Sequence, residues 1–529
     1  MLLIMSGAYL NSEFTAEFGR LPPSFLPVGN KRLFQWQLNV LRHVSDRITM
    51  TLPEDFVPTA VDQAFLADHG VELVRMPAGL SLGAGIVYCL NVCRAYFEPI
   101  HLLLGDTLVG AEGLDESDMA LVAKTSEYYS WAEVVRDGNS GFRFQEGLPG
   151  DQTPREVLCG YFTFSDPSLL IESIVRCGNA FVAGVDLYAS QRPLTLRTTD
   201  KWLDFGHVQL YYQSKSEMTT QRAFNHLQAS RRAILKSSND EDKIRAEAEW
   251  FETLPDDLRV YTPTYMGRCA EAGRFGYRTE YLRLSTLSEL LVFGRLPAFV
   301  WNAILDGCDE FLHAAAGHRP ADAKTIGGGE DYGGKTLKRL ETYLRQCGDL
   351  DLDHPCRYGD KALPSLHRIV DICAGAVPAP APDHVTIWHG DFCFSNIFYD
   401  FRGQQIKTID PRGRTFDGRH SVFGDRRYDI AKLSHSIVGL YDLIIAGHYT
   451  LETSNSHAFS IELAQSREIG ALQTLFQERA MAGIDTADPA IAAMNVMLFL
   501  SMLPLHADSP KRQRALLANG LRMFAHLDA

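Results

Sequence analysis

The chain has 529 residues, 46% of them hydrophobic and 22% charged, which is typical of a globular protein too long for a single core. Its formal net charge is −14, so an overall basic surface for nucleic acid is excluded and we expect no nucleic-acid partner. Any phosphate-bearing ligand must therefore be met by local cations or by a metal ion.

The sequence also favours a cytoplasmic location. Its ten cysteines include no C-x-x-C pair, which is typical of reduced thiols. The apolar residues 1–5 have neither the charged segment nor the length of a secretion signal, and they predict a buried first strand. The apolar stretch at 494–505 is too short for a membrane span, so we expect no membrane partner. A homo-oligomer is compatible with the sequence, which specifies no oligomeric state.

Strand-like runs alternate with helical patterns along the first 215 residues. Because strands joined by covering helices run parallel, we expect βαβ units and a mostly parallel sheet, which makes 1–215 an α/β domain. The expected strands are 1–6, 47–51, 72–75, 100–104 and 119–124, and the expected helices are 34–44 and 83–94.

Four segments of this half have an order known from one enzyme family. They are the segment after the first strand at 21–34, the apolar strand ending in Gly-Asp at 102–106, GYFTF at 160–164 and WLDFG at 202–206. Together they resemble the sugar-phosphate nucleotidyltransferases, which implies a Rossmann-like fold. The resemblance also implies that Asp106 and Asp204 hold Mg²⁺, and that a substrate phosphate attacks the α-phosphorus of CTP or another nucleoside triphosphate. An isolated Gly-Asp is also a common turn, so a turn without metal is the alternative for Asp106.

The first loop departs from that family. Of its glycine-rich signal only Gly7 remains, Glu13 replaces the expected Arg, and Pro23 replaces the expected Lys. Three cations nearby are left to neutralise a triphosphate: Arg20, Lys31 and Arg32. The half is therefore a divergent nucleotidyltransferase, a related transferase using a nucleotide-sugar donor, or a nonreactive binding or assembly module.

Residues 233–529 have a different pattern, and the polar segment 216–232 is expected to be a rigid helical connector between the halves. The expected elements, in order, are a strand at 233–236, a helix at 242–254, a strand at 276–282, helices from 287, a hairpin at 397–409 and a largely helical end at 439–529.

One motif of this half suits ATP-dependent phosphoryl transfer. The sequence HGDFCFSN at 389–396 is followed by Ile409 and Asp410. Phosphoryl transfer needs a carboxylate to orient the attacking hydroxyl and accept its proton, and oxygen ligands for Mg²⁺ on the nucleotide phosphates. Asp391 is the candidate base. Asn396 and Asp410 are the candidate metal ligands, because the hairpin between them brings both to one edge.

The motif, with DPRG at 410–413 and GDRRYDIAK at 424–432, resembles the aminoglycoside phosphotransferase and choline kinase superfamily. The resemblance implies an α+β protein-kinase-like fold with an N-terminal lobe at 233–284 and a helical C-terminal lobe at 285–529. It also implies ATP and Mg²⁺ as cofactors and a small-molecule hydroxyl as acceptor.

The resemblance assigns the nucleotide contacts. Lys236 ends the first strand and is expected to position the α and β phosphates, held by Glu247 rather than Glu249, because Glu247 and Trp250 form the family's Glu-x-x-Trp pattern. A hinge at Glu280 to Leu282 is expected to meet the adenine. In the family pattern Asp429 is structural.

Two further features stay open on the sequence alone. Four arginines follow the candidate metal ligand, and they either bind an anionic acceptor or pair with Asp425 and Asp429: Arg412, Arg414, Arg426 and Arg427. The glycine-rich stretch at 321–344 either helps to form the acceptor pocket or only connects helices.

The presence of both halves in one chain suggests two consecutive reactions. A kinase makes a phosphomonoester, and a nucleotidyltransferase uses that product as its nucleophile, which yields an NDP-activated building block of the kind used for capsules and surface glycans. The alternative is a small-molecule kinase whose first half is a binding module or a nucleotide-sugar-using transferase. A regulatory kinase-like protein is disfavoured by the complete motif. A protein kinase is disfavoured because no activation segment ending in Ala-Pro-Glu is recognisable.

Overall fold

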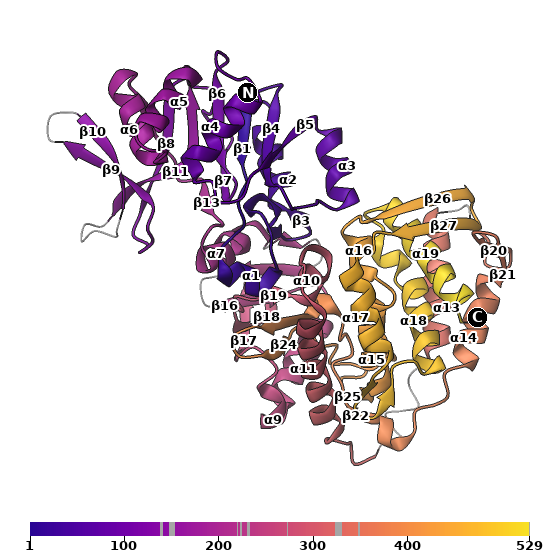
Figure 1. Cartoon of the computed structure of the whole chain (residues 1–529). Coiled ribbons are helices and arrows are strands. Elements are labelled where there is room, and N and C mark those ends of the chain that lie inside the picture. Colours follow the sequence, from indigo (N-terminus) through magenta and orange to yellow (C-terminus); the bar gives the residue numbers. More distant parts are fainter. Residues whose placement is uncertain are drawn as a thin grey trace. The chain divides into compact units, whose positions relative to one another are not determined.

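The computed structural model describes residues 1–137, 141–147, 154–219, 221–222, 225–229, 233–271, 273–322, 331–347 and 350–527. The chain forms two compact units, Met1–Met218 and Thr219–Ala529 (Figure 1). Each unit has its own sheets and its own core.

The first unit is an α/β domain built on one large sheet. Four central strands run parallel in the order β6-β1-β4-β5, and β11 extends the sheet on the β6 side in the antiparallel direction. Every residue of β1 is buried, as expected for a central strand covered on both faces. The strands of the sheet are β1 (Leu2–Met5), β4 (Ile48–Pro53), β5 (Val71–Met76), β6 (Ile100–Leu104), β8 (Met119–Thr125), β9 (Ala132–Asp137), β10 (Gly141–Glu146), β11 (Arg155–Phe164) and β12 (Thr195–Thr198).

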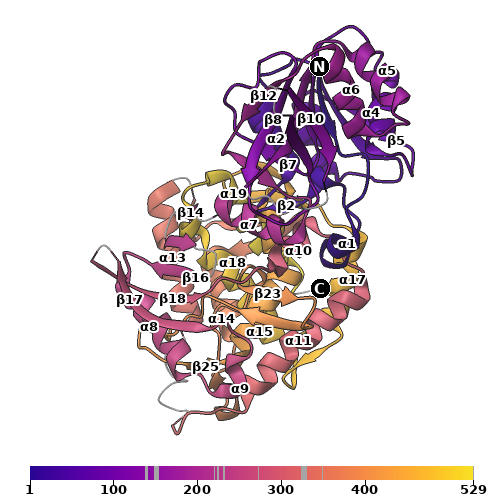
Figure 2. The same cartoon turned by 90° about the vertical axis from the view of Figure 1, so that its left-hand side faces the viewer.

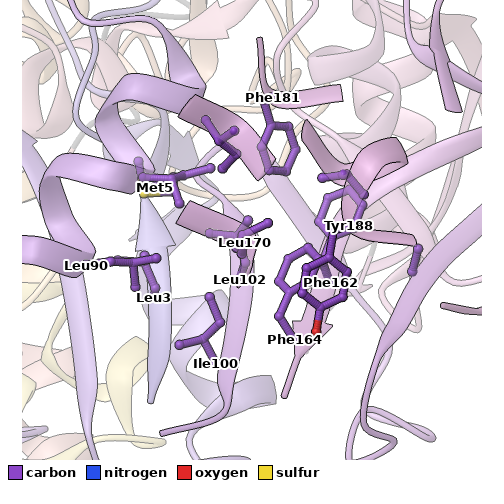
Figure 3. Close-up of a cluster of buried hydrophobic side chains, with 14 of the residues drawn as sticks. Leu3, Met5, Leu90, Ile100, Leu102, Phe162, Phe164, Leu170, Phe181 and Tyr188 are labelled. Atoms are coloured by element: carbon purple, nitrogen blue, oxygen red, sulfur yellow. The ribbon is translucent and has the colours of Figure 1, made fainter. Parts of the chain in front are cut away.

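Helices cover this sheet, and the expected strands and helices of 1–124 are all present. Three helices, α4, α5 and α6, pack Leu90, Leu170 and Phe181 against Leu3 and Phe162 of the sheet (Figure 3). This cluster is the main core of the unit. The helices are α1 (Ser12–Phe18), α2 (Leu33–Leu41), α3 (Ala60–Asp68), α4 (Leu82–Val92), α5 (Pro167–Arg176), α6 (Phe181–Gln191) and α7 (Val208–Thr219), and two short pairs of strands are β2 (Pro27–Val28) with β3 (Lys31–Arg32) and β7 (Thr107–Val109) with β13 (Trp202–Asp204).

The second unit begins with a five-stranded antiparallel sheet against which helix α8 packs. Its order is β14-β15-β16-β18-β17, and Ile244, Ala248 and Phe251 of α8 are buried, as the sequence predicts. The elements are β14 (Gln221–Arg222), β15 (Asn225–Ala229), β16 (Ala233–Ser237), α8 (Glu241–Thr253), α9 (Asp256–Arg259), β17 (Tyr265–Glu271) and β18 (Arg274–Glu280).

The rest of this unit is mainly helical (Figure 2). Its core helices α15 and α19 both pack against α18, and α13 packs on the same helix. The helices are α10 (Leu287–Phe293), α11 (Ala298–Ala316), α13 (Tyr332–Cys347), α14 (Leu366–Gly375), α15 (Arg426–Ile437), α16 (Tyr441–Ile445), α17 (Arg467–Gln477), α18 (Pro489–Ser501) and α19 (Pro510–Ala525).

Short strands connect these helices. The predicted hairpin is present as β23 and β24, which β19 extends. The strands are β19 (Ser285–Thr286), β20 (Pro355–Tyr358), β21 (Lys361–Ser365), β22 (Val385–Ile387), β23 (Ile397–Asp400), β24 (Gln405–Thr408), β25 (Phe423–Asp425), β26 (Tyr449–Asn455), β27 (Ala458–Leu463), β28 (Ala480–Met481) and β29 (Ile484–Asp485).

One expectation about these elements is wrong. The connector expected to be helical over 216–232 is helical only to Thr219, and β14 and β15 then join the sheet, so the sheet begins before the expected limit at 233. The end at 439–529 is largely helical, as expected, but it also contains the β26–β27 hairpin, which completes the sheet β21-β20-β27-β26. Apolar and polar residues alternate along β27, and this alternation is the sequence signal for a strand.

No helix among the described residues combines the length and the apolar character needed to cross a membrane.

Candidate functional site

In the first unit, the predicted metal ligands Asp106 and Asp204 lie side by side. Asp106 stands in the turn between β6 and β7, and Asp204 ends β13, which pairs with β7. The Phe205 amide donates to the Asp106 carbonyl oxygen at 2.8 Å. A Cβ added to Gly206 would lie 2.4 Å from Asp106 Oδ2 and 3.4 Å from Asp204 Oδ1, so only a glycine leaves room between the two carboxylates.

The charges of this carboxylate pair fit a cation. Burial, with a further contribution from Asp204, raises the pKa of Asp106 to about 6. Asp204 accepts hydrogen bonds from Trp131 Nε1 at 2.6 Å and from the Gly206 amide at 2.6 Å, and His207 Nδ1 lies 3.0 Å from its Oδ2. The hydrogen bond to Asp204 raises the pKa of His207. Two facing carboxylates repel each other, and a divalent cation bound by their oxygens relieves that repulsion.

The other residues predicted to bind nucleotide in this unit have other partners. Arg20 pairs with exposed Asp55 at 3.4 Å and lies over the Tyr9 ring, and Lys31 lies 4.9 Å from the Trp36 ring centre. Gly7 follows β1, where a Cβ would meet Met76 Cγ at 2.4 Å. Among the described residues, no contact joins these three to Asp106 or Asp204. The neighbouring candidate Arg32 is buried, paired with Asp62 and bonded to the Phe25 carbonyl oxygen.

In the second unit, Lys236 joins the predicted helix glutamate to the predicted metal ligand. Its Nζ lies 2.7 Å from Glu247 Oε2 and 2.8 Å from Asp410 Oδ1. Tyr277 of β18 donates its hydroxyl to the same Glu247 oxygen at 2.9 Å. Burial alone would lower the pKa of Lys236, but the two carboxylates raise it above its ordinary value, so the ammonium stays charged. Glu249 instead accepts from His420 Nδ1 at 2.7 Å, so the choice of Glu247 as the partner of Lys236 is confirmed.

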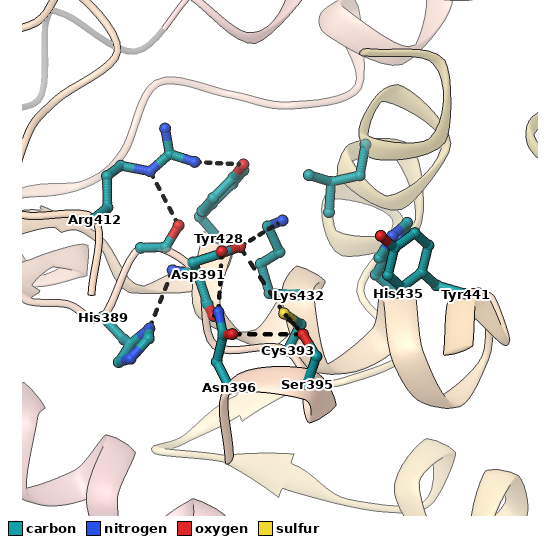
Figure 4. A network of polar contacts seen from close by, with 12 residues as sticks. His389, Asp391, Cys393, Ser395, Asn396, Arg412, Tyr428, Lys432, His435 and Tyr441 are labelled. Carbon is teal, nitrogen blue, oxygen red and sulfur yellow. Dashed lines mark hydrogen bonds and ion pairs between the residues drawn. The ribbon is translucent and has the colours of Figure 1, made fainter. Parts of the chain in front are cut away.

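Asp391, the candidate base, lies in a polar network with Lys432 and Asn396 (Figure 4). Lys432 Nζ on α15 is 2.7 Å from Asp391 Oδ1, and Asn396 Nδ2 donates to Asp391 Oδ2 at 3.0 Å. Burial alone would raise the pKa of Asp391, but the Lys432 ammonium outweighs it and holds that pKa well below its usual range. Asp391 is therefore ionised and oriented, which a base that accepts a hydroxyl proton requires.

Hydrogen bonds to Asp429 fix the backbone of the loop that carries Asp391. The backbone amides of His389 and Gly390 each donate to the Asp429 carboxylate at 2.7 Å, and burial raises the pKa of Asp429 to about 7. His389 is fully buried, and burial lowers its pKa to about 4, so it is neutral. Asp429 thus acts on the loop backbone and holds Asp391 in place.

The predicted metal ligands Asn396 and Asp410 are brought to one edge by the hairpin. The Ile409 amide donates to the Asn396 carbonyl oxygen at 3.0 Å, and Asp410 has a φ of 60°, a left-handed conformation that Asp tolerates better than most residues. Asn396 Oδ1 and the Asp410 carboxylate are hard oxygen donors, which fit Mg²⁺ that keeps its waters and nucleotide phosphates as the other ligands. Among the described residues, no group of three or more His, Cys, Asp or Glu forms a metal cage by itself.

The segment after Asp410 packs on helix α8 through a glycine. Gly413 has a φ of +64°, and a Cβ there would lie 2.2 Å from the Ala246 carbonyl oxygen of α8. Trp250 Nε1 of α8 donates to the Trp388 carbonyl oxygen at 2.8 Å, which fixes the same helix to the residue that follows β22 and precedes the loop of Asp391. The helix that holds Glu247 and the loop that holds Asp391 are therefore packed as one body.

We expect Gly413→Ala to destabilise the chain more than Gly418→Ala. Both glycines have positive φ, at +64° and +90°, and an alanine costs about 1–2 kcal/mol in that region at either position. Nothing lies within 4 Å of a Cβ at Gly418, whereas Gly413 adds the overlap with α8. Melting temperatures of the two variants measure the difference. Equal melting temperatures would show that the segment does not pack tightly on α8.

The expected hinge at Glu280 to Leu282 begins at the last residue of β18. The Glu280 carboxylate accepts from the Thr264 hydroxyl at 2.9 Å, so this side chain is bound to the residue just before β17. A cavity of about 670 Å³ borders Glu280 and Leu282 together with Met266 and Lys407. Lys236, Glu247, Asp391 and Asp410 do not line this cavity.

The four arginines after Asp410 separate into paired and unpaired groups. Arg427 forms a buried ion pair with Asp425 at 2.7 Å, and Arg414 pairs with Asp240 and Asp242. Arg412 donates instead to the Gly390 carbonyl oxygen at 3.0 Å and to the Tyr428 hydroxyl at 3.2 Å. Arg426 makes no ion pair within 4.0 Å in the described part of the chain. Residues 323–330 of the glycine-rich stretch at 321–344 lie outside the described residues, and the expected helix is present as α13.

Three similar solved structures match the N-terminal part of the chain, which corresponds to the first unit. No family model and no curated protein matches the chain. The nucleoside-diphosphate-sugar pyrophosphorylase from Vibrio cholerae RC9 is 13% identical with a TM-score of 0.33, and the match covers 41% of this chain and 99% of that one. HddC from Yersinia pseudotuberculosis is 14% identical with a TM-score of 0.31, over 41% and 99%. The inositol-1-phosphate CTP transferase from T. maritima is 15% identical with a TM-score of 0.30, over 42% and 97%. These values assign the chain to no family.

Sequence reasoning gave no role to Lys432, Trp131 or His207. Lys432 ends the GDRRYDIAK run, yet nothing in the run indicates that its ammonium reaches Asp391. Trp131 lies 73 residues before Asp204, so their contact depends on how two separate segments meet. His207 is only three residues after Asp204, but nothing in the sequence indicates that its ring lies against that carboxylate.

Proposed function

We propose that the second unit is an ATP-dependent, Mg²⁺-requiring small-molecule kinase and that the first unit is a nucleotidyltransferase. The observation that carries the proposal is the convergence of Lys236, Glu247 and Asp410 on one ion-pair network, with an ionised Asp391 bonded to Asn396 in the same unit. The order of these residues along the chain is that of the aminoglycoside phosphotransferase and choline kinase superfamily. Phosphoryl transfer is catalysed mainly by positioning and charge, which this arrangement supplies.

In the proposed reaction, Asp391 orients the acceptor hydroxyl and takes its proton as oxygen attacks the γ-phosphorus. The bond from the γ-phosphorus to the bridging oxygen breaks, and ADP leaves. Lys236, held by Glu247, positions the α and β phosphates. Asn396 and Asp410 hold Mg²⁺, which neutralises charge on the phosphates when it is bound. Lys432 keeps Asp391 ionised. The backbone at Glu280 to Leu282 is the proposed adenine contact.

The first unit supplies the proposed second step. The new phosphomonoester attacks the α-phosphorus of CTP or another nucleoside triphosphate, pyrophosphate leaves, and an NDP-linked product forms. Asp106 and Asp204 hold the metal for this step, and Gly7, Arg20 and Lys31 remain the proposed triphosphate contacts, although none touches the carboxylate pair. Such products are building blocks for capsule or surface glycans made from the cytoplasm. A kinase with a binding module or a nucleotide-sugar-using transferase as its first unit is the second candidate, which the exposed ion pair of Arg20 favours.

The test of this function is nucleotide consumption by the full-length protein. The protein is given Mg²⁺, ATP and CTP together with a panel of alcohols, sugars and hydroxy acids, and the products are separated by mass. A phosphorylated acceptor that continues to an NDP conjugate supports both steps. A phosphorylated acceptor that accumulates with every nucleoside triphosphate supports the second candidate. If no ADP forms with any acceptor, the kinase proposal is contradicted.

We expect Asp106→Asn and Asp204→Asn to weaken metal binding by the full-length chain. Each change removes one charged oxygen donor, and losing a charged partner costs about 1.5–3 kcal/mol, or roughly 10-fold to 150-fold in affinity. The measurement is Mn²⁺ binding followed by electron paramagnetic resonance, in protein that also carries Asp410→Asn so that only the first unit contributes. Asp200→Asn, an exposed aspartate just before β13, is the matched control. Unchanged Mn²⁺ binding in both variants would remove the metal role.

A further inference from the structure

Cations from three segments gather around the Tyr428 side chain, next to Asp391. Arg412 Nη2 lies 3.2 Å from this hydroxyl, and Lys335 Nζ of α13 lies 3.4 Å from it. Lys432 Nζ is 5.9 Å from the centre of the Tyr428 ring. Arg339 is one turn after Lys335 on α13, on the same face of the helix. We call these four residues the cation cluster.

Two members of the cluster have no carboxylate partner. Among the described residues, Arg412 and Arg339 form no ion pair within 4.0 Å, and both side chains are half-buried. Their hydrogen bonds go to neutral oxygens, namely the Gly390 carbonyl, the Tyr428 hydroxyl and the Ser501 carbonyl. Burial, together with the nearby Arg412, lowers the pKa of Arg339. A half-buried guanidinium without a counter-ion is costly, and a carboxylate or phosphate is the group its planar fork binds best.

The acidic groups that face the cluster do not balance it. Asp391 is engaged by Lys432 at 2.7 Å. Asp429 is occupied by two backbone amides, and Asp425 is occupied by Arg427. Among the described residues, Arg412 and Arg339 therefore have no carboxylate in an ion pair with them, in a chain whose formal net charge is −14.

Arg412 and Tyr428 lie on the side of Asp391 away from Asn396. Figure 4 shows Asn396 on one side of Asp391, and Arg412 with Tyr428 on the other. The proposed nucleotide contacts Lys236 and Asp410 are bonded to each other and to α8, and neither contacts a member of the cluster in the described residues. A ligand held by Arg412 would thus present its own hydroxyl to Asp391 from the side opposite the metal ligands.

We propose that the phosphoryl acceptor is an anion, a small hydroxy compound with a carboxylate or phosphate that Arg412 and Arg339 bind while its hydroxyl meets Asp391. This inference rests on the proposed kinase function and names its substrate class. The anion takes no part in bond making: the hydroxyl oxygen attacks the γ-phosphorus, ADP leaves, and the proton goes to Asp391. Binding of the anionic group places the hydroxyl for that attack.

The test compares neutral and anionic members of matched pairs on the full-length protein, such as glycerol with glycerate and glycerol phosphate, and glucose with gluconate and glucose 6-phosphate. We expect ADP formation with an anionic member and at least about 10-fold less with its neutral partner. Comparing ADP formation with glycerate and gluconate to ADP formation with glycerol phosphate and glucose 6-phosphate shows whether a carboxylate or a phosphate is preferred. Turnover of neutral members alone overturns the inference and leaves the kinase intact.

Variants separate an acceptor site from a site for the γ-phosphate. Arg412→Met and Arg339→Met should raise the acceptor KM about 10-fold to 100-fold and leave the ATP KM unchanged, with partial recovery in Arg412→Lys. Arg419→Met, exposed in the same segment and paired with Asp417, is the control. A raised ATP KM with an unchanged acceptor KM would show that the cluster serves the nucleotide and would overturn the inference.

A binding measurement covers the case in which no acceptor of the panel turns over. Inorganic phosphate, titrated by calorimetry into protein without nucleotide, should bind to the wild-type chain and bind at least about 10-fold more weakly to Arg412→Met. Equal binding to both proteins, or no binding to either, overturns the inference. The proposed kinase function is tested separately by titrating ATP in the same calorimeter. Absence of ATP binding would contradict that function.

Discussion

Replacing Asp391 by Asn is expected to reduce phosphorylation about 10²-fold to 10⁴-fold, the contribution typical of a positioned general base. The amide keeps the shape of the side chain and its contact with Asn396, but it cannot accept the hydroxyl proton. It also leaves Lys432 without its carboxylate at 2.7 Å. The measurement is kcat for ADP formation with saturating ATP, together with the Kd of ATP, which should change little.

The control for Asp391 is Asp417→Asn. Asp417 is an exposed aspartate of the same segment that pairs with Arg419, and its replacement should change kcat by no more than about twofold, as surface substitutions usually do. Near-normal turnover of Asp391→Asn would mean that another group takes the proton. Rescue by Lys432→Met in the same chain would instead show that the unpaired ammonium caused the loss.

Replacing Lys236 by Met is expected to destabilise the chain by about 3–5 kcal/mol, the cost of breaking a buried ion pair from one side. Glu247, whose side chain is 1% exposed, would keep its charge with only the Tyr277 hydroxyl and distant Lys243 as partners. ATP binding should also weaken, because the ammonium that positions the phosphates is gone. Urea unfolding and ATP titration measure the two effects.

A second substitution separates the two effects of Lys236→Met. Adding Glu247→Gln removes the stranded charge, so much of the lost stability should return while ATP binding stays weak. Lys243→Met is the matched control, since that lysine is exposed and lies 3.8 Å from Glu247 Oε1. If ATP binding recovers with stability, Lys236 supports the fold only and does not position the phosphates.

The sequence alone predicted the site residues that lie close together along the chain. Asp391, Asn396 and Asp410 are separated only by a loop and a hairpin, and the short-range signals of turns and alternating strands specify such units. Residues two apart on a helix face different ways, so only one of Glu247 and Glu249 could meet Lys236, and the Glu-x-x-Trp pattern of the resembled family selected Glu247. Asp106 and Asp204 are about 100 residues apart, so their spacing does not predict that they meet. The resemblance of motifs predicted this pair.

Only the tertiary structure decided which groups act on these residues from a distance. Lys432 reaches Asp391 because α15 is packed behind the loop, and Arg339 joins the same region from α13, some 50 residues earlier in the chain. The connector expected to be helical at 216–232 differs for the same kind of reason: β15 pairs with the edge of β16, and β14 pairs with β15, which no local pattern records. The sequence by itself determined the short-range elements and the acid groups. Long-range packing determined the charge that surrounds them, because ion pairs depend on distance in space and not on separation along the chain.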